Sequence, residues 1–392
     1  MGKRVLLITR CITGPGPNVL RRQSFARYVL EQGCQLDVLG YNKEDSLPVG
    51  VNYYQSKRHV SFTFLKWFIT LLSNYFYLLK VQSLVSFFRR VGLAAMTMAS
   101  AERLFTFNEY DICLVSIHPW AFYLIIPYLV KYNPTVLDIS DPLYKNAIYS
   151  GSDNRANLRL EQTALNAATH IITMNEPTIR IMMDEMGILP QKVSFISPAM
   201  NVSSFTRYEH VTCPIHNPLR IIYTGSLYAG YRDLEELQPA IDNLNGRVNL
   251  DVFSNSGYSP KDSVFINRYD VVSHERVLQL YRQYDILLFV DNFYGYQVPS
   301  KIFEIMAQNK PILFVYDKRN TYFYEKLKNQ EGIYFVENKR NDIETVLMRL
   351  CNSKYLSVEY DMDLNEYSEQ ATNRKLWECL SNSVNNLLDI PR

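Results

Sequence analysis

The sequence predicts an α/β protein with two parallel, doubly wound sheets of the Rossmann-like kind. Three observations support this: the length of 392 residues, the alternation of short β-branched runs with amphipathic helical patterns, and the recurrence of that alternation in the second half. A chain of this length exceeds one ordinary core, so two domains of roughly 150 to 200 residues are expected. Strand patterns that alternate with helical patterns are typical of βαβ units, whose strands run parallel.

The first half contains six strand-like runs separated by helical patterns. RVLLIT at 4–9 is the first strand, and the helical pattern at 20–33 ends on Gly33, a residue type that commonly terminates helices. Further strands are expected at 34–40, 110–117, 134–140, 169–175 and 192–198, and further helices at 120–132, 155–168 and 176–187. This order predicts a first domain at residues 1–200.

The second half repeats this order after a segment with no clear period. Residues 201–219 contain two prolines and are predicted to be a linker. Strands are then expected at 220–225, 248–254, 263–270, 285–290, 311–315 and 332–337, and helices at 232–244, at 273–283 and from about 300. The pattern predicts a second domain at 201–369. An amphipathic pattern at 369–390 has no strand after it, so a C-terminal helix is expected within about 370–392.

The composition is that of a globular protein, with 47% hydrophobic and 20% charged residues. A net charge of +2 hides an asymmetry, because residues 1–200 carry 20 Lys/Arg and 14 Asp/Glu whereas residues 201–392 carry 21 and 25. The six cysteines are scattered without a CxxC spacing, which predicts neither a zinc cluster nor a disulfide framework and suits a reducing compartment. The first apolar run is too short for a signal peptide. We expect a cytoplasmic protein without a nucleic-acid partner.

One stretch of 56 residues, from Ser46 to Ala101, contains no Asp or Glu and is rich in Phe, Leu and Tyr. Its longest uncharged run has 13 residues, from Trp67 to Leu79, whereas a membrane-spanning helix needs about 20, so no span is predicted. Two interpretations stay open: buried helices, or an interfacial surface whose cations and aromatic rings suit anionic headgroups. The missing acids favour the second, which predicts peripheral contact with an anionic membrane through about 57–100.

The stretch YTGSLYAGYRDL at 223–234 is a candidate binding loop. It predicts a strand, a glycine turn and the start of a helix. Gly225 and Gly230 allow a ligand to approach the backbone closely, and a helix N-terminus attracts anions. The guanidinium of Arg232 suits a phosphate that accepts two hydrogen bonds. The spacing is not the GxGxxG fingerprint, and an ordinary turn remains the alternative.

The stretch QVPSKIFEIMAQNKPILFV at 297–315 combines a loop, a helix and a buried strand. Ser300 is the expected N-cap and Lys301 the first helical residue. A cation at a helix N-terminus opposes the macrodipole, and such a local misfit is typical of a functional site. A bound phosphate would resolve the misfit, and Glu304 one turn later is suited to accept hydrogen bonds from ribose hydroxyls. The alternative is a solvated lysine and glutamate on an exposed helix.

Together, YTGSLYAGYRDL and VPSKIFEIMAQNKPIL resemble motifs of the GT-B glycosyltransferases, in particular the retaining family called GT4. The resemblance covers most of the chain in layout. It implies two Rossmann-like domains facing each other across a cleft, with the C-terminal helix returning to the first domain. It also implies a nucleotide-diphosphate sugar as donor. Many members build bacterial polysaccharides, which implies a lipid-linked glycan acceptor at the inner face of the cytoplasmic membrane.

The resemblance also assigns roles within the second domain. It implies that Lys301 and Arg232 hold the diphosphate, that Glu304 holds the ribose and that Gly225 lies at the donor. One departure stands out. Many relatives have a second glutamate eight residues before the ribose glutamate, and this chain has Tyr296 there. The resemblance therefore does not identify the group that contacts the donor sugar.

The first domain is expected to bind the acceptor through residues at the ends of its strands. Gly14 and Gly16 lie in the loop after the first strand, and the ends of two later strands carry His118, Asp138 and Asp141. If the sheet is parallel, these residues share one edge. A histidine or an aspartate can take the proton of an acceptor hydroxyl. The alternatives are an aspartate that caps a turn and a histidine packed in the core.

The predicted activity is therefore transfer of a sugar without a metal or cofactor. No DxD-like pair follows a strand of the second domain, so cations rather than a metal ion are expected to neutralise the diphosphate. Retention of the anomeric configuration is implied by the family resemblance alone. Two other functions stay open: a sugar-nucleotide epimerase of similar fold, and a catalytically silent GT-B module that serves as a partner subunit.

Overall fold

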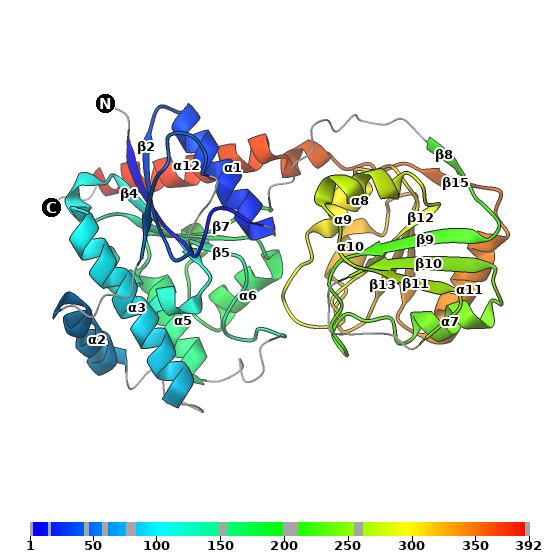
Figure 1. Cartoon of the computed structure of the whole chain (residues 1–392), viewed down its shortest axis with the longest axis horizontal. Coiled ribbons are helices and arrows are strands. Elements are labelled where there is room, and N and C mark those ends of the chain that lie inside the picture. Colours follow the sequence, from blue (N-terminus) through cyan, green and yellow to red (C-terminus); the bar gives the residue numbers. More distant parts are fainter. Residues whose placement is uncertain are drawn as a thin grey trace. The chain divides into compact units, whose positions relative to one another are not determined.

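The computed structural model describes residues 3–14, 17–42, 47–56, 62–75, 84–148, 155–198, 211–254 and 262–388. The chain folds into two compact units (Figure 1). Unit 1 comprises Met1–Asn201, Tyr296–Val298 and Glu366–Arg392, and unit 2 comprises Val202–Gly295 and Pro299–Asn365. A three-residue segment from the middle of the second half thus packs with unit 1, as does the C-terminal helix.

Unit 1 contains a seven-stranded parallel sheet in the order β3-β2-β1-β4-β5-β6-β7. Its first six strands have the doubly wound order, with the crossover beside β1. The strands are β1 (Arg4–Ile8), β2 (Gln35–Gly40), β3 (Asn52–Gln55), β4 (Ile112–Ile117), β5 (Thr135–Ile139), β6 (His170–Thr173) and β7 (Val193–Phe195).

Helices cover both faces of this sheet (Figure 1). They are α1 (Pro17–Glu31), α2 (Phe62–Tyr75), α3 (Leu84–Leu104), α4 (Ile126–Leu129), α5 (Arg155–Ala167), α6 (Glu176–Asp184) and α12 (Glu369–Leu388), with 3₁₀ turns η1 (Phe107–Glu109), η2 (Trp120–Leu124), η3 (Pro190–Lys192) and η4 (Leu364–Tyr367). Alternate residues of β1 point to opposite faces. Val5 and Leu7 pack with α1 and α12, whereas Leu6 and Ile8 pack with α2, α3 and α5.

The C-terminal helix is part of the first unit. Leu376 and Leu380 of α12 are buried in the same core as Phe25 and Val29 of α1. The side-chain amide of Asn373 donates to Ser24 Oγ at 2.7 Å. The expected return of the C-terminal helix to the first unit is therefore confirmed.

Unit 2 contains a six-stranded parallel sheet in the order β11-β10-β9-β12-β13-β14, the same doubly wound order, and an antiparallel pair of β8 and β15. Its strands are β8 (Val211–Pro214), β9 (Leu219–Thr224), β10 (Val248–Phe253), β11 (Ile266–Tyr269), β12 (Ile286–Val290), β13 (Ile312–Tyr316), β14 (Ile333–Glu337) and β15 (Tyr355–Val358).

Five helices flank this sheet in the described part of unit 2: α7 (Leu237–Asn243), α8 (His274–Tyr281), α9 (Lys301–Met306), α10 (Tyr322–Leu327) and α11 (Arg340–Cys351). Leucine and isoleucine side chains of α7 and α11 cover one face. The other face is aromatic. The rings of Phe289 and Phe314 of the sheet lie 4.7 Å apart between centroids, and both meet Phe323 of α10, at 6.0 and 6.4 Å. Phe323 in turn meets Phe303 of α9 at 5.8 Å. The predicted fold class is confirmed in both units.

Two predictions about local structure are wrong. The helix expected from residue 232 begins at Leu237. The backbone groups of Arg232 are engaged in an antiparallel bridge with those of Tyr228, so Arg232 belongs to a turn rather than to the helix. The predicted linker at 201–219 includes strand β8, which pairs with β15 far along the chain. The part of that linker at 201–210 lies outside the described residues.

The acid-free stretch forms a helix pair that contributes to the core of unit 1. Trp67 and Leu71 of α2 and Val91 of α3 are buried there. Glu102, the first acid after the stretch, accepts a hydrogen bond from Trp67 Nε1 at 2.6 Å and pairs with Lys66 at 2.8 Å. Within the described ranges, no helix has the length and apolarity needed to cross a bilayer. The buried-helix interpretation is thus confirmed for one side of the pair.

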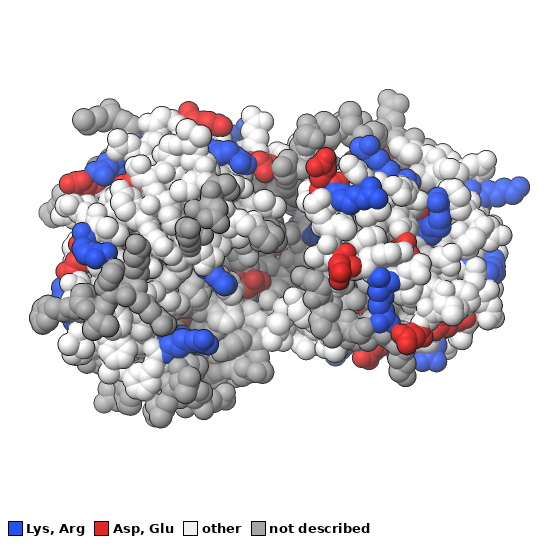
Figure 2. All heavy atoms as spheres, viewed as in Figure 1, with Lys and Arg blue, Asp and Glu red and all other residues white. Residues whose placement is uncertain are grey.

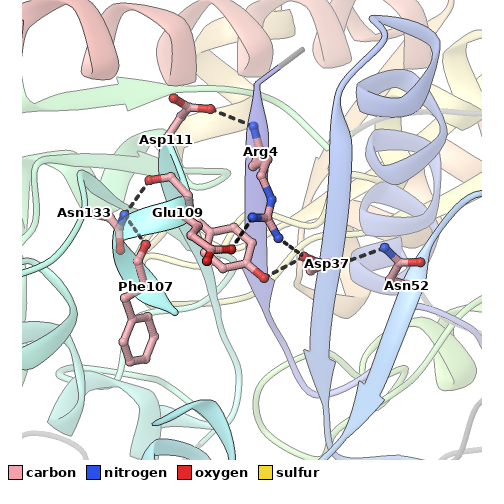
Figure 3. Close-up of polar contacts among 8 residues, drawn as sticks. Arg4, Asp37, Asn52, Phe107, Glu109, Asp111 and Asn133 are labelled. Atoms are coloured by element: carbon pink, nitrogen blue, oxygen red, sulfur yellow. Dashed lines mark hydrogen bonds and ion pairs between the residues drawn. The ribbon is translucent and has the colours of Figure 1, made fainter. Parts of the chain in front are cut away.

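A polar cluster joins the amino ends of the strands in unit 1 (Figure 3). The guanidinium of Arg4 donates to Glu109 at 2.5 Å and to Asp37 at 3.5 Å. Asp37 also accepts hydrogen bonds from Tyr110 Oη at 2.6 Å and from Asn52 Nδ2 at 2.8 Å. Both carboxylate oxygens of this buried aspartate therefore have protein partners. We refer to these five residues as the amino-end cluster.

Charges elsewhere on the surface are mixed. On the face shown in Figure 2, basic and acidic side chains of the described residues are interspersed with uncharged surface. That face therefore presents no broad basic area, among the residues described, of the kind that a nucleic-acid backbone requires.

Candidate functional site

The carboxyl ends of the parallel strands in unit 2 gather the donor-side residues predicted from the sequence. Gly225 follows β9, and Asp291 and Asn292 follow β12. Lys301 and Glu304 lie on α9, which begins after the same β12 loop. Ligands of doubly wound proteins bind at this edge, beside the strand where the order reverses. The strand next to β9 on that side is β12, so the predicted residues lie at the reversal point.

The two carboxylate oxygens of Glu304 differ in their contacts. Its Oε2 is 3.1 Å from Nε2 of His274 on α8, while its Oε1 is buried and has no hydrogen-bond partner among the described residues. Burial raises the pKa of Glu304, but His274 and Lys301 outweigh burial, and the pKa is lowered overall. A carboxylate with one oriented oxygen and one unused oxygen is suited to accept hydrogen bonds from a ligand.

The cation Lys301 lies near this carboxylate, and Arg232 lies near Lys301. Burial lowers the pKa of Lys301, with Arg232 acting in the same direction and Glu304 against it. The ammonium group of Lys301 has no hydrogen-bond or ion-pair partner in the part of the chain that the structure describes. Arg232 donates from Nε to Asn292 Oδ1 at 2.9 Å, and its Nη2 contacts the same oxygen. An unpaired, half-buried ammonium beside a guanidinium is a favourable environment for an anion.

The argument from the helix dipole does not hold in its predicted form. Ser300 occupies the N-cap position, but its side chain accepts no capping hydrogen bond. The helix that follows has only six residues, so its dipole is small. What makes Lys301 unusual is burial beside Arg232 rather than its position on the helix.

Asp291 adds a second half-satisfied carboxyl group at this edge. It is buried, its Oδ1 accepts from the backbone N–H of Asn292 at 2.7 Å, and its Oδ2 has no partner among the described residues. Burial raises the pKa of Asp291 to about 7, although Asn292 and Arg232 oppose this shift. Two buried carboxyl oxygens at this edge thus lack protein partners.

Gly225 supplies the close backbone approach expected from the sequence. Its φ of +148° is strained for residues with a side chain, and an added Cβ would lie 3.3 Å from the hydroxyl of Tyr223. Its N–H donates to the carbonyl oxygen of Phe253 at 3.0 Å, which ties the turn to the end of β10.

The carboxyl ends of the unit 1 strands place His118 near Asp141. Burial lowers the pKa of His118, while the negative charge of Asp141 raises it and Arg22 and Arg10 lower it. The centroid of the imidazole ring lies 4.9 Å from the centroid of the Trp120 ring. A histidine kept neutral and next to a carboxylate is suited to accept a proton from a hydroxyl group.

Asp138 is placed differently from His118 and Asp141. It lies inside β5, is buried and forms an ion pair with Arg21 Nη2 at 3.1 Å. Arg21 also donates to the carbonyl oxygens of Ile196 and Ser197. A buried carboxylate in an ion pair favours a structural role. The structure thus places His118 near Asp141, whereas Asp138 is engaged by Arg21.

Gly14 is a further predicted residue, and it lies in a loop of unit 1. Gly14 is exposed, with φ +119° and open space where a Cβ would be, so only the backbone angle favours glycine there. Gly16 lies outside the described residues. Tyr296, which stands where many relatives have a glutamate, belongs to the short segment that packs with unit 1 and contacts its core. In the same segment, Gln297 Nε2 donates to Asp141 Oδ1 at 3.2 Å.

Sequence reasoning missed three residues of the unit 2 edge: His274, Asp291 and Asn292. His274 follows Ser273, whose side chain caps α8 by accepting from the backbone N–H of Arg276. That capping signal marks a helix start but gives no sign of a contact 30 residues away. In the described part of the chain, no group of three or more His, Cys, Asp or Glu side chains is arranged to hold a metal ion.

By sequence, the chain matches no protein-family model and no curated protein. By structure, it is similar to a glycosyltransferase from Rickettsia africae, with 13% identity and a TM-score of 0.58 over 98% of this chain and 99% of that one. It is also similar to Anabaena HepE in complex with UDP and glucose (10% identity, TM-score 0.57, 97% of this chain and all of that one). WaaG, a glycosyltransferase of lipopolysaccharide biosynthesis, gives 11% identity and a TM-score of 0.57 over 98% of this chain and all of WaaG.

These similarities extend over nearly the whole chain and define its fold as GT-B. At identities of 10–13% they establish the architecture and leave the chemistry to the residues of the site.

Proposed function

We propose that this chain is a glycosyltransferase whose unit 2 binds a nucleotide-diphosphate sugar and whose unit 1 binds the acceptor. One observation carries the proposal. At the carboxyl edge of the unit 2 sheet, the ammonium group of Lys301 and the buried Oε1 of Glu304 lie near each other, and neither has a partner among the described residues. A nucleoside diphosphate has the complementary groups, since its phosphates are anionic and its ribose hydroxyls are donors.

Each residue then has a separate task. Lys301 and Arg232 neutralise the diphosphate, which gains negative charge as the bond to the sugar breaks. Glu304 accepts hydrogen bonds from the ribose and fixes the nucleotide in place. In unit 1, His118, which lies within the influence of the negative charge of Asp141, takes the proton of the acceptor hydroxyl. The proposed reaction requires no metal ion, because two protein cations serve the leaving group.

We propose UDP as the nucleotide of the donor. Solved structures of HepE contain UDP, UDP-glucose, or UDP with glucose, and their fold matches this chain over 97% of its length. The finer features come from the motif resemblance: membership of GT4, retention of configuration, and an acceptor that is a lipid-linked glycan of bacterial surface polysaccharide. WaaG, a structural neighbour, acts in lipopolysaccharide biosynthesis, which supports the last of these.

The test is a transfer assay with radiolabelled UDP-sugars, run with EDTA and with added Mg²⁺ or Mn²⁺. Label should appear in a glycan or lipid acceptor at equal rates with and without the chelator. Conversion of the donor into another sugar nucleotide would indicate an epimerase. Nucleotide binding without turnover would indicate a silent partner subunit, and loss of transfer in EDTA that a divalent ion restores would overturn the metal-independent mechanism.

The proposed lipid acceptor calls for contact with a membrane, and the helix pair of unit 1 supports such contact. On the side away from the core, Leu65 and Ile69 of α2 and Phe88 of α3 are about half exposed. Arg89 follows Phe88 directly and is also exposed. Apolar side chains next to a cation match the boundary of an anionic bilayer.

Substitution of Ile69 and Phe88 by Ser, together with Arg89→Glu, should weaken binding to anionic vesicles. Each cation near such a surface contributes about 1 kcal/mol, and that attraction is screened at high salt. Co-sedimentation with anionic and neutral vesicles at two salt concentrations measures the effect, and Leu189→Ser, an exposed apolar residue of another loop, is the control. Equal, negligible binding of the unmodified protein to both vesicle types would refute the membrane contact.

A further inference from the structure

His274 is the structural partner of the carboxylate proposed to hold the ribose. Its Nε2 lies 3.1 Å from Glu304 Oε2, and the imidazole comes from α8, an element separate from the α9 helix that carries Glu304. The contact takes up one carboxylate oxygen and leaves the buried Oε1 for a ligand. Among the described residues, this is the one hydrogen bond that the carboxylate of Glu304 accepts.

The charges around His274 favour its protonated form. From α9, Glu304 faces it as an acceptor, and Lys301 is the nearby cation. The hydrogen bond to Glu304 raises the pKa of His274, burial and Lys301 lower it, and the net shift is upward. On α8 itself, Glu275 is exposed and Arg276 donates to Gln279. The ionised Glu304 is thus the main electrostatic influence on this histidine.

We propose that His274 is a positioning residue for donor binding: as an imidazolium it fixes Glu304 through Oε2, so that Oε1 meets the ribose hydroxyls. This inference rests on the proposed function, since it assumes that Glu304 binds a ribose. It goes beyond that function because it makes recognition of the ribose depend on the protonation of a residue that does not touch the nucleotide.

The proposal fixes the direction of the pH dependence. The pKa of His274 is raised in the folded protein, so the charged pair is fully formed below the ordinary histidine value of about 6.5. It is lost as the pH rises through the raised value. Preference for a ribose over a deoxyribose should therefore be strong in mildly acidic solution and weaken in alkaline solution.

The test compares the dissociation constants of UDP and 2′-deoxy-UDP by calorimetry between pH 5.5 and 9. The ratio of the two constants isolates the ribose contact, because both nucleotides share the same titrating phosphate. In the unmodified protein, the ratio should fall by about fivefold from the acidic to the alkaline end. If UDP does not bind, ADP and GDP are screened, and the deoxy analogue of the one that binds replaces 2′-deoxy-UDP.

Two variants separate positioning from charge. His274→Ala should reduce the ratio about fivefold at pH 5.5 and abolish its pH dependence. His274→Gln keeps a hydrogen-bond donor that does not titrate, so it should retain part of the preference with a flat pH profile. Because His274 is nearly half exposed, thermal unfolding should confirm that both variants fold.

The matched control is His216→Ala. His216 also contacts a carboxylate of unit 2, with Nδ1 2.5 Å from Asp285 Oδ1, but that pair lies at the amino ends of β9 and β12. Its substitution should leave both the ratio and its pH dependence unchanged.

The outcomes distinguish this inference from the function on which it rests. If no nucleoside diphosphate binds the unmodified protein, the proposed function fails and the inference fails with it. If UDP binds and His274→Ala keeps the full preference for the ribose with an unchanged pH profile, the inference is overturned while the donor site stands. A change of the same size in His216→Ala would also overturn it, because the effect would not be specific to Glu304.

Discussion

Two polar clusters lie at opposite ends of parallel sheets in this protein, and they differ in how completely their carboxylates are paired. In the amino-end cluster of unit 1, both oxygens of Asp37 accept hydrogen bonds from protein groups. At the carboxyl edge of unit 2, Glu304 uses one oxygen and Asp291 uses one, and the other two are buried without partners among the residues that the structure describes. Both regions are rich in charge, so charge density alone does not mark a site.

The difference between the two clusters separates polar groups that stabilise the fold from polar groups that are suited to bind a ligand. A paired buried group contributes to folding, whereas an unpaired buried group costs free energy until a ligand supplies the missing partner. The amino-end cluster is not perfect, because Arg4 Nε is buried without a hydrogen bond, but the nitrogens at the end of its guanidinium are paired. The unit 2 edge leaves an ammonium and two carboxyl oxygens open, which is the pattern of a site prepared for a ligand.

The largest expected effect concerns the amino-end cluster and the free energy of unfolding. Asp37→Ala leaves Tyr110 and Asn52 without their acceptor and should destabilise the protein by roughly 2 to 4 kcal/mol. Chemical denaturation measures the loss, and calorimetry with UDP should give an unchanged dissociation constant. A fall in UDP affinity without a loss of stability would reverse the assignment of the two clusters.

The second prediction concerns the open charges. Lys301→Ala and Arg232→Ala each remove a charge-assisted contact to the diphosphate and should weaken UDP binding by roughly 1.5 to 3 kcal/mol. Stability should stay the same in Lys301→Ala or rise slightly, because a half-buried cation that has no partner among the described residues is lost. Lys339→Ala is the control, since that lysine is exposed and paired with Glu337. Unchanged UDP affinity in both variants would remove the donor site from this edge.

The smallest effect compares two buried carboxyl groups whose pKa is raised to about 7 by burial. Asp291 of unit 2 has one open oxygen, whereas Glu161 of unit 1 accepts from Tyr123, Leu143 and Tyr144. A raised pKa means that stability is greatest below the unfolded value and declines as the pH rises to about 7. Asp291→Asn should remove the part of the pH-dependent loss of stability that comes from ionising Asp291. The variant should therefore be more stable than the unmodified protein above pH 7, by up to about 1 kcal/mol.

Thermal unfolding at several pH values checks this contrast. Glu161→Gln should lower stability at every pH, because a glutamine amide cannot accept all the hydrogen bonds that the carboxyl group accepts. If Asp291→Asn were equally harmful, the open oxygen of Asp291 would have an essential role in the fold, and the distinction between paired and open groups would lose its meaning for unit 2.

Much of the fold was predictable because its central strands are continuous apolar runs. ILLFV at 286–290 and ILFVY at 312–316 are buried on both faces, and such runs follow directly from the sequence. Strands β3 and β8 were missed for the opposite reason. β3 is Asn-Tyr-Tyr-Gln, and β8 pairs with a strand about 140 residues away, so only the folded chain shows that they are strands.

The site was predictable where a motif marks it and hidden where contacts come from distant elements. Lys301, Glu304 and Arg232 stood out because their types and spacing match a known pattern. His274 carries no such mark, since its role depends on α8 and α9 lying side by side. The ion pair of Asp138 with Arg21 was also hidden, because the sequence does not show that Arg21 reaches this aspartate.

The antiparallel pair of β8 and β15 has an evolutionary consequence. These strands stand at the entry and the exit of unit 2 and hydrogen-bond to each other, from Val211 with Val358 to Pro214 with Tyr355. The six-stranded parallel sheet of unit 2 lies between them in the sequence. The two ends of the segment from 211 to 358 are therefore joined to each other by hydrogen bonds. Recombination at this ribbon would exchange the whole sheet of unit 2, together with the segment Tyr296–Val298 that packs with unit 1, and leave the strands of unit 1 uncut. Under the proposed function, such an exchange would replace the residues proposed to bind the donor in one genetic step and keep most of those proposed to bind the acceptor.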